Sequence, residues 1–183
     1  MAKKKGVRVT IVVEDERLER FSRNVLLEFG FSRHELRVVP YPVGRGSAKD
    51  WVEKHYPIEV RALRSKAHQK LALLVGTDAD ERSVAERFRS LARALQRHDV
   101  PARMDDERIV LWVPKWNIET WMLYLSGDPR DEDHDYKHDV KKPDFTAVAK
   151  AFVAEYRRFE DDDSIEALAS LRVAFVETER FGV

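Results

Sequence analysis

The stretch LALLVGTDAD, residues 71–80, decides the fold and contains the first candidate site residues. It opens with an apolar run that has the length and composition of a buried strand. Asp78 and Asp80 follow this run directly, and open α/β sheets bind their ligands at the carboxyl ends of strands. A second apolar run, residues 7–13, ends in Glu14-Asp15-Glu16. Two acidic strand ends predict a site for a hard divalent cation, because magnesium is held by carboxylates together with substrate phosphates.

The alternation of apolar runs and helical patterns predicts an α/β domain over residues 1–126. The expected sheet has about four mainly parallel strands with flanking helices. Strands are expected at residues 7–13, 35–42, 71–76 and 108–113. Helices are expected at residues 16–29, 48–55, 58–66, 84–98 and 118–125. Ser83 with Glu86 forms a capping-box pattern before the fourth of these helices.

Residues 127–183 are expected to form a charged loop and a helical C-terminal extension packed on the same domain. The loop, residues 127–143, is rich in charge and has no hydrophobic period. Helices are expected at residues 145–159 and from 164 to about 177, with Asp163 and Glu166 as candidate caps for the second.

Composition narrows the class of protein. The chain has 183 residues, of which 43% are hydrophobic, and this is enough for a real core. It contains no cysteine, which excludes disulfides, thiolate chemistry and cysteine-bound zinc and favours a reducing compartment. No apolar run approaches the roughly 18 residues of a membrane span, and no signal-like segment precedes the first strand. We therefore expect a cytoplasmic protein that does not enter a membrane.

Charge is balanced overall but unevenly distributed. Residues 1–72 contain 16 Lys and Arg against 9 Asp and Glu, whereas residues 129–183 contain 9 against 14. Phosphate binding draws on basic side chains, so the first third of the chain is the candidate nucleic-acid face. The alternative is an ordinary solvated surface, since 36% of all residues are charged.

A third candidate segment follows the fourth expected strand. Glu119 lies within a mostly apolar helix, and burying a carboxylate is costly unless it is paired or bound to metal. The alternative is that Glu119 faces solvent while its apolar neighbours pack inward. Lys115 is placed to neutralise a phosphate near the site, although a lysine after a strand is often merely exposed.

Other patterns favour ordinary structural roles. Gly44-Arg45-Gly46-Ser47 could bind an anion but is more typical of a flexible turn. His134 and His138 have a metal-ligand spacing but lie in the charged loop. The tryptophans of residues 112–121 could stack bases, but their position beside a core strand is more typical of packing.

Two of these motifs resemble the signatures of the Toprim family. They are Val12-Val13-Glu14 before a helix, and residues 76–82, GTDADER. Toprim domains occur in topoisomerases, bacterial primases, recombination proteins, small RNA maturases and OLD-type nucleases. The resemblance covers residues 7–126 and implies a Toprim-like compact sheet. It departs from the family at Asp15, where many relatives have glycine, and at Glu81-Arg82-Ser83, which argues against a topoisomerase.

The resemblance also implies site residues. In the family the first-strand glutamate acts in acid/base or metal chemistry and the Asp-x-Asp pair binds magnesium, which implies these roles for Glu14, Asp78 and Asp80. The stretch of residues 114–125 resembles one in small OLD-like and RloB-like Toprim nucleases of phage-defence loci. That likeness adds Glu119 to the site. It also implies an ABC-type or SMC-like ATPase as a partner.

The resulting hypothesis is a nuclease that depends on Mg²⁺ or Mn²⁺ and hydrolyses phosphodiester bonds of DNA or RNA. Its expected catalytic residues are Glu14, Glu119 and Lys115, and its expected metal ligands are Glu14, Asp78, Asp80 and Glu119. Two alternatives remain open: a non-catalytic Toprim-like module that binds nucleic acid or regulates a partner, and an RNA-maturation ribonuclease.

Overall fold

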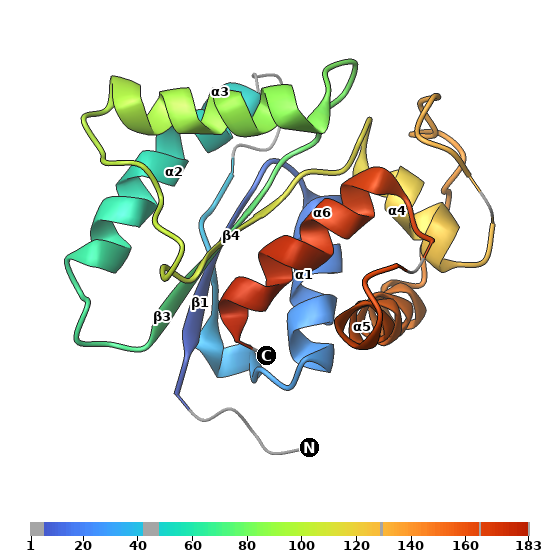
Figure 1. The fold of residues 1–183 in the computed structure, drawn as a ribbon, viewed down its shortest axis with the longest axis horizontal. Coiled ribbons are helices and arrows are strands. Elements are labelled where there is room, and N and C mark those ends of the chain that lie inside the picture. The colour runs from blue at the N-terminus through green and yellow to red at the C-terminus, as the bar shows by residue number, and fades with distance from the viewer. Residues whose placement is uncertain (1–5, 42–47, 129, 165, 183) are drawn as a thin grey trace.

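The computed structural model describes residues 6–41, 48–128, 130–164 and 166–182. At its centre is a four-stranded sheet in which every strand pairing is parallel, in the order β2-β1-β3-β4 (Figure 1). The strands are β1 Arg8–Val13, β2 Leu36–Val38, β3 Leu71–Gly76 and β4 Ile109–Trp112. The prediction of an α/β fold with a parallel sheet and a helical C-terminal region is confirmed.

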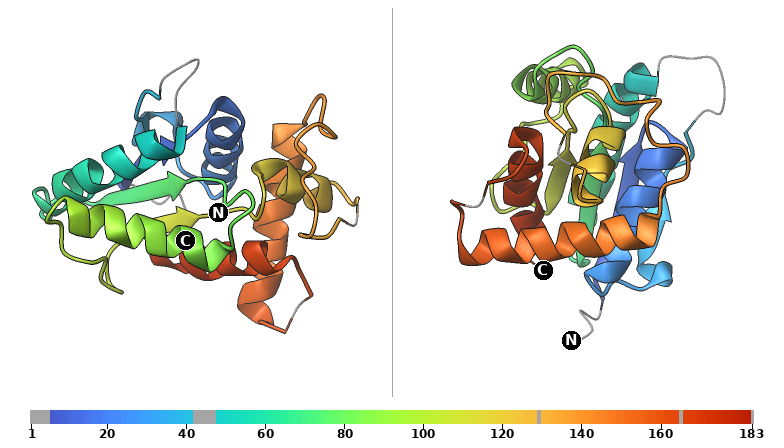
Figure 2. Two further views of the ribbon diagram at one scale, coloured as in Figure 1. Left: turned by 90° about the horizontal axis from the view of Figure 1, so that it is seen from above. Right: turned by 90° about the vertical axis from the view of Figure 1, so that its right-hand side faces the viewer.

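Helices cover both faces of the sheet, as Figure 2 shows from two sides. One face packs against α1, α4, α5 and α6, and the other against α2 and α3. The helices are α1 Glu16–Glu28, α2 Ala48–Arg64, α3 Val84–Arg97, α4 Ile118–Leu125, α5 Phe145–Asp161 and α6 Ala169–Thr178. Both faces of the sheet are therefore covered, which explains why β3 and β4 read as continuous apolar runs.

The strand order makes the chain diverge at the carboxyl ends of β1 and β3. The chain leaves β1 through α1, which lies on one face of the sheet, and leaves β3 toward α3, which lies on the other. β1 and β3 are neighbours, so their following loops diverge from a common edge. This is a topological switch point, where open α/β sheets bind ligands beyond the carboxyl ends of the strands.

Two local predictions were wrong in detail, and a third was not tested. Residues 48–66 contain one helix, α2, because Val52, Tyr56 and Val60 are buried on one side and hold it together through Pro57. The second strand has only three residues and follows a 3₁₀ turn at Arg33–Glu35. The proposed anion-binding turn of residues 44–47 lies outside the described residues.

The last helix also begins later than expected. α6 starts at Ala169, and the residue preceding it, Leu168, makes no side-chain cap. Asp163 and Glu166 are therefore not its caps. Tertiary packing fixes this helix instead, because Leu171, Ala174 and Phe175 are buried in the core that α5 also joins.

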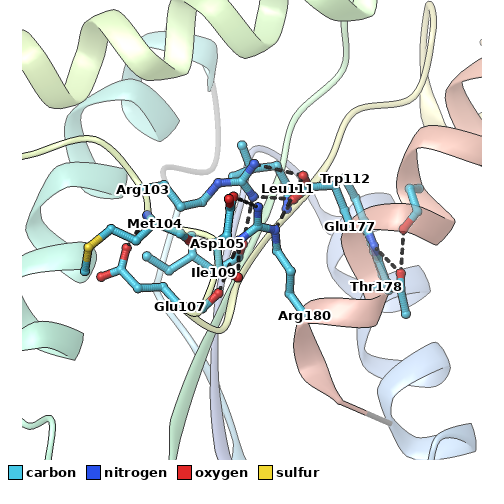
Figure 3. Close-up of polar contacts among 11 residues, drawn as sticks. Arg103, Met104, Asp105, Glu107, Ile109, Leu111, Trp112, Glu177, Thr178 and Arg180 are labelled. Atoms are coloured by element: carbon cyan, nitrogen blue, oxygen red, sulfur yellow. Dashed lines mark hydrogen bonds and ion pairs between the residues drawn. The ribbon is translucent and has the colours of Figure 1, made fainter.

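The C-terminal extension packs directly on the α/β domain. α5 contributes Phe152 and Tyr156 to the same core as α1, and Phe152 lies edge-on to Phe21 of α1. The end of α6 is tied to β4 by a polar network, drawn in Figure 3. In it, Glu177 pairs with Arg103 and accepts a 3.0 Å hydrogen bond from the backbone N–H of Leu111. Among the residues described, none of the helices combines the length and apolarity that a membrane span requires.

Candidate metal centre

The first two acidic segments converge at the switch point. Val13 at the end of β1 pairs with Gly76 at the end of β3. Glu14 follows the first strand at once, and Asp78 lies two residues beyond the second. The backbone N–H of Asp78 donates a 3.2 Å hydrogen bond to Oε1 of Glu14, so the two strand ends are joined through the acid itself.

Three carboxylates form a cluster at this edge. Glu14, Asp15 and Asp78 each offer a ligand oxygen, and these oxygens lie within 4.8 Å of one another. Asp15 also caps α1, because its Oδ1 accepts a 2.9 Å hydrogen bond from the N–H of Leu18. The cap fixes the position of Asp15 beside the other two acids.

Burial makes this cluster unusual. Glu14 is 9% exposed and Asp78 is 6% exposed. Oδ1 of Asp78 has no hydrogen-bond partner among the described residues. A buried carboxylate oxygen without a partner is costly, and binding of a cation is one way in which proteins offset that cost.

The electrostatics of the cluster favour a cation. Burial raises the pKa of Asp78 well above its ordinary value, and the charges of Glu14, Asp15 and Glu119 raise it further. Burial also raises the pKa of Glu14, although hydrogen bonds from Thr77 and from the backbone of Asp78 oppose the shift. Both acids are held close together in a poorly solvated place, so a positive ion would relieve a repulsion that the fold imposes.

The donor set suits a hard cation. It consists of carboxylate oxygens, which are the preferred ligands of magnesium, calcium and manganese, and the chain has no cysteine that would favour a soft metal. The cluster could therefore hold a metal ion.

Asp80, one of the expected metal ligands, stands apart from this group. The three clustered acids do not include it. Its backbone adopts a left-handed conformation with φ of 52°, and its N–H donates to the carbonyl of Trp116 at 3.0 Å. This bridge turns the chain after β3 toward the segment that follows β4. A metal-binding role for Asp80 stays a prediction.

Lys115 supports the same turn. Its Nζ donates to the carbonyls of Asp80 and Arg82 at 2.7 and 2.9 Å, and it lies 4.2 Å from the ring centroid of Trp116. The ammonium group thus fixes the backbone of the turn. Direct contact of Lys115 with a phosphate also stays a prediction.

Glu119 is buried rather than solvent-facing. It is 3% exposed and forms an ion pair with Arg17 on the first turn of α1. Burial raises the pKa of Glu119 even though the charge of Arg17 opposes the shift. Its charge acts on Asp78, so it belongs to the electrostatic surroundings of the cluster without being one of the three acids.

The expected metal ligands did not include Asp15, which the structure places in the cluster. Sequence reasoning also missed Thr77, which contacts Glu14, and Arg87, which contacts Thr77. Thr77 is fully buried and donates a 2.8 Å hydrogen bond to Oε2 of Glu14. Arg87 is 2% exposed and donates to the Thr77 hydroxyl. The sequence did contain a signal for Arg87, because it lies four residues before Leu91 and therefore on the buried side of α3.

The other candidates have structural roles. Trp112 and Trp121 are fully buried, and both pack near Phe152 in the core. His134 forms a surface pair with Asp131, in a loop without helical structure.

Comparison of the chain with protein-family models, with curated proteins and with solved structures found no match.

Proposed function

We propose that this protein is a metal-dependent nuclease that hydrolyses phosphodiester bonds with Mg²⁺ or Mn²⁺. The observation that carries the proposal is the buried cluster of Glu14, Asp15 and Asp78 at the switch point, with an oxygen of Asp78 left without a partner. The Toprim-like sequence signatures support the choice of phosphodiester chemistry over other reactions that use a divalent cation.

In this proposal the cation is held by Glu14, Asp15 and Asp78. Asp80 and Glu119 remain candidates for further ligands of the cation. A bound cation would neutralise charge on a phosphate and lower the pKa of a water molecule. The rigid placement of the acids supports such a role. The cap made by Asp15 fixes one of them, and Glu14 accepts hydrogen bonds on both of its oxygens.

Two positively charged side chains near the cluster, Arg17 and Lys137, suit a phosphate-containing substrate. Arg17 pairs with Glu119 through one guanidinium nitrogen, and its side chain remains 37% exposed. Lys137, in the loop after α4, lies close enough to Asp78 to lower the pKa of that group. Both are available to contact a nucleic-acid backbone, where phosphate contacts position the substrate.

The proposal includes DNA or RNA as substrate, and by resemblance an ABC-type or SMC-like ATPase as partner in a cytoplasmic phage-defence system. The same geometry is compatible with a module that binds nucleic acid without cleaving it. A specific observation favours the enzyme. A surface that only binds nucleic acid needs no buried acidic cluster, and burial of Asp78 with its Oδ1 lacking a partner is costly unless a cation is bound.

The test is cleavage of supercoiled plasmid DNA and of end-labelled structured RNA by the full chain, with Mn²⁺, with Mg²⁺ and with chelator. We expect metal-dependent nicking of one substrate, and a loss of about 100-fold or more in Asp78→Ala. The matched control is Asp144→Ala, which removes an acid that caps α5 by accepting from the N–H groups of Thr146 and Ala147. Binding without cleavage of either substrate, at all metal concentrations, would favour the non-catalytic module.

A further inference from the structure

A chain of hydrogen bonds links Glu14 through Thr77 and Arg87 to Glu53 of α2, and its links between Glu14, Thr77 and Arg87 are buried. Oε2 of Glu14 accepts from the hydroxyl of Thr77 at 2.8 Å. That hydroxyl in turn accepts from Nε and Nη2 of Arg87, at 3.1 and 2.6 Å. Nη1 of Arg87 donates to Oε1 of Glu53 on α2 at 2.8 Å, and Glu53 also accepts from Arg97.

The donors and acceptors of this chain can be arranged in only one way. A threonine hydroxyl has one hydrogen and two lone pairs. Arg87 has no acceptor, so its two N–H groups occupy both lone pairs of the Thr77 oxygen. The single hydroxyl hydrogen must then be donated to Glu14.

The other oxygen of Glu14 is fixed as well, because the N–H of Asp78 donates to it. A carboxylate has about four acceptor positions, so the two hydrogen bonds leave others free on the side of the cluster. The arrangement therefore sets the rotation of the Glu14 carboxylate and presents its remaining lone pairs to Asp15 and Asp78.

Glu53 completes the arrangement by balancing the charge of Arg87. Burial raises the pKa of Glu53, but hydrogen bonds from Ser90 and Arg97 and the charge of Arg87 outweigh it and lower the pKa overall. A charged Glu53 allows a guanidinium to stay deep in the protein, where an unpaired charge would be strongly unfavourable.

We infer that Thr77, which contacts Glu14, and Arg87, which contacts Thr77, are positioning residues that hold the Glu14 carboxylate ready to bind a divalent cation. The inference rests on the proposed metal site. Hydrogen-bond partners behind metal ligands commonly fix ligand orientation, and their loss typically lowers metal affinity about 10–100-fold.

The experiment measures Mn²⁺ binding to the full chain by calorimetry, without substrate, and compares three variants. Thr77→Val keeps the shape and removes the hydroxyl, and we expect its affinity to fall about 10–100-fold. Thr77→Ser restores the hydroxyl and should bind within about threefold of wild type. Thr178→Val is the matched control. Thr178 is also fully buried, and it accepts from Trp112 and donates to a backbone carbonyl, but it lies on α6 beside β4.

A fourth variant, Arg87→Lys, tests the inference independently if Thr77→Val does not fold. Lysine keeps the positive charge but cannot make the two N–H hydrogen bonds by which Arg87 fixes the Thr77 hydroxyl. We therefore expect about a tenfold loss of Mn²⁺ affinity. Equal affinity in wild type, Thr77→Val and Arg87→Lys would overturn the inference while leaving the metal site intact. An equal loss in Thr178→Val would also overturn it, because general destabilisation would then explain the result.

Crystal structures of the metal-free wild type and Thr77→Val separate this inference from the proposed function. If wild type binds no Mn²⁺ at millimolar concentration, the proposed metal site fails. The inference about Thr77 is then tested by the orientation of the Glu14 carboxylate, with a crystal structure of Thr178→Val as the control. Rotation of the Glu14 carboxylate in Thr77→Val but not in Thr178→Val supports the inference. An unchanged orientation in Thr77→Val refutes it.

Discussion

Arg17 and Glu119 are 102 residues apart in the sequence and form an ion pair between the first turns of α1 and α4. The pair joins the segment after β1 to the segment after β4 across the carboxyl edge of the sheet. Glu119 is buried by the contact, whereas the side chain of Arg17 keeps 37% of its exposure. This asymmetry allows the arginine to regain water if its partner is lost, so the pair has limited value for stability alone.

Glu119→Gln is therefore expected to affect activity more than stability. Glutamine keeps the shape and can still accept a hydrogen bond from Arg17, but it removes a negative charge that acts on Asp78. We expect metal-dependent cleavage to fall about 10–100-fold and the melting temperature to stay within roughly 2 °C of wild type. Plasmid nicking and differential scanning calorimetry measure the two effects.

The matched control for that variant is Glu177→Gln. Glu177 is likewise a buried glutamate paired with an arginine, but it lies at the β4 edge. We expect the control to lower stability and to leave activity per folded molecule unchanged. Full activity in Glu119→Gln would restrict Glu119 to its structural pair with Arg17.

The acidic cluster makes the stability of the metal-free protein depend on pH. Because burial raises the pKa of Asp78 above the value of 3.8 expected for an unfolded chain, the folded protein binds more protons between these two values. The free energy of unfolding therefore decreases as pH rises through that window. Glu14, whose pKa is raised above 4.5, acts in the same direction.

Asp78→Asn is expected to stabilise the metal-free protein at neutral pH. Asparagine resembles the protonated acid and removes the repulsion with Glu14. The gain should be on the order of 1 kcal/mol, or roughly 2–4 °C at this chain length, and it should shrink as pH falls toward 4. Thermal unfolding from pH 4 to 8 measures it, and the variant should also lose the thermal shift that Mn²⁺ produces in wild type. A gain that is constant across this range would contradict the proton-linkage explanation.

Much of the fold was predictable because its signals are local. The apolar run of β3 and the capping box of Ser83 and Glu86 are readable in the sequence, and both are present in the structure. The first residue of α6 could not be predicted, because no capping residue marks it. The position of α6 depends instead on packing against β4 and α5. The two helices expected at residues 48–55 and 58–66 are one helix, α2, since burial of Val52, Tyr56 and Val60 outweighs the helix-breaking preference of Pro57.

The candidate site was predictable only where residues follow strands directly. Glu14 and Asp78 could be placed at one edge from their distance to β1 and β3 alone. Asp80 could not be placed, because its left-handed backbone and its bridge to Trp116 depend on a distant segment. The spacing of Arg87 from Leu91 indicates the buried side of α3, but the sequence does not indicate that its partner there is Thr77.

Gly76 provides a test of how tightly the strand ends must pack. A Cβ at this position would lie 3.0 Å from Cδ2 of Leu18 and 3.1 Å from Cγ1 of Val13. In Gly76→Ala the side chains of Leu18 and Val13 must therefore give way by a few tenths of an ångström, beside the segment that carries Glu14 and Asp15. We expect a loss of about 1–3 kcal/mol in unfolding free energy and weaker Mn²⁺ binding. Unchanged affinity would show that the cluster tolerates displacement of its supporting elements.

The pair of Arg103 and Glu177 protects the outer edge of β4 (Figure 3). Arg103 donates to the carbonyl of Ile109 at 2.8 Å, and Glu177 accepts from the N–H of Leu111 at 3.0 Å, so the two side chains occupy hydrogen-bonding positions that a neighbouring strand would use. An unpaired edge strand is a template for association between chains. The pair thus satisfies one carbonyl and one N–H group at the outer edge of β4.

Glu177→Ala is expected to destabilise the protein strongly and to expose this edge. It leaves Arg103 without its partner and the Leu111 amide without an acceptor, for which we expect a loss of about 3–5 kcal/mol. Urea unfolding measures the loss, and hydrogen exchange should show faster exchange at Leu111 than at Leu74 in the sheet interior. Asp105→Ala is the control, because Asp105 pairs with Arg180 in the same network while its own side chain is fully exposed, so no measurable change is expected. Equal stability of Glu177→Ala and wild type would mean that packing of α6, rather than this pair, closes the sheet.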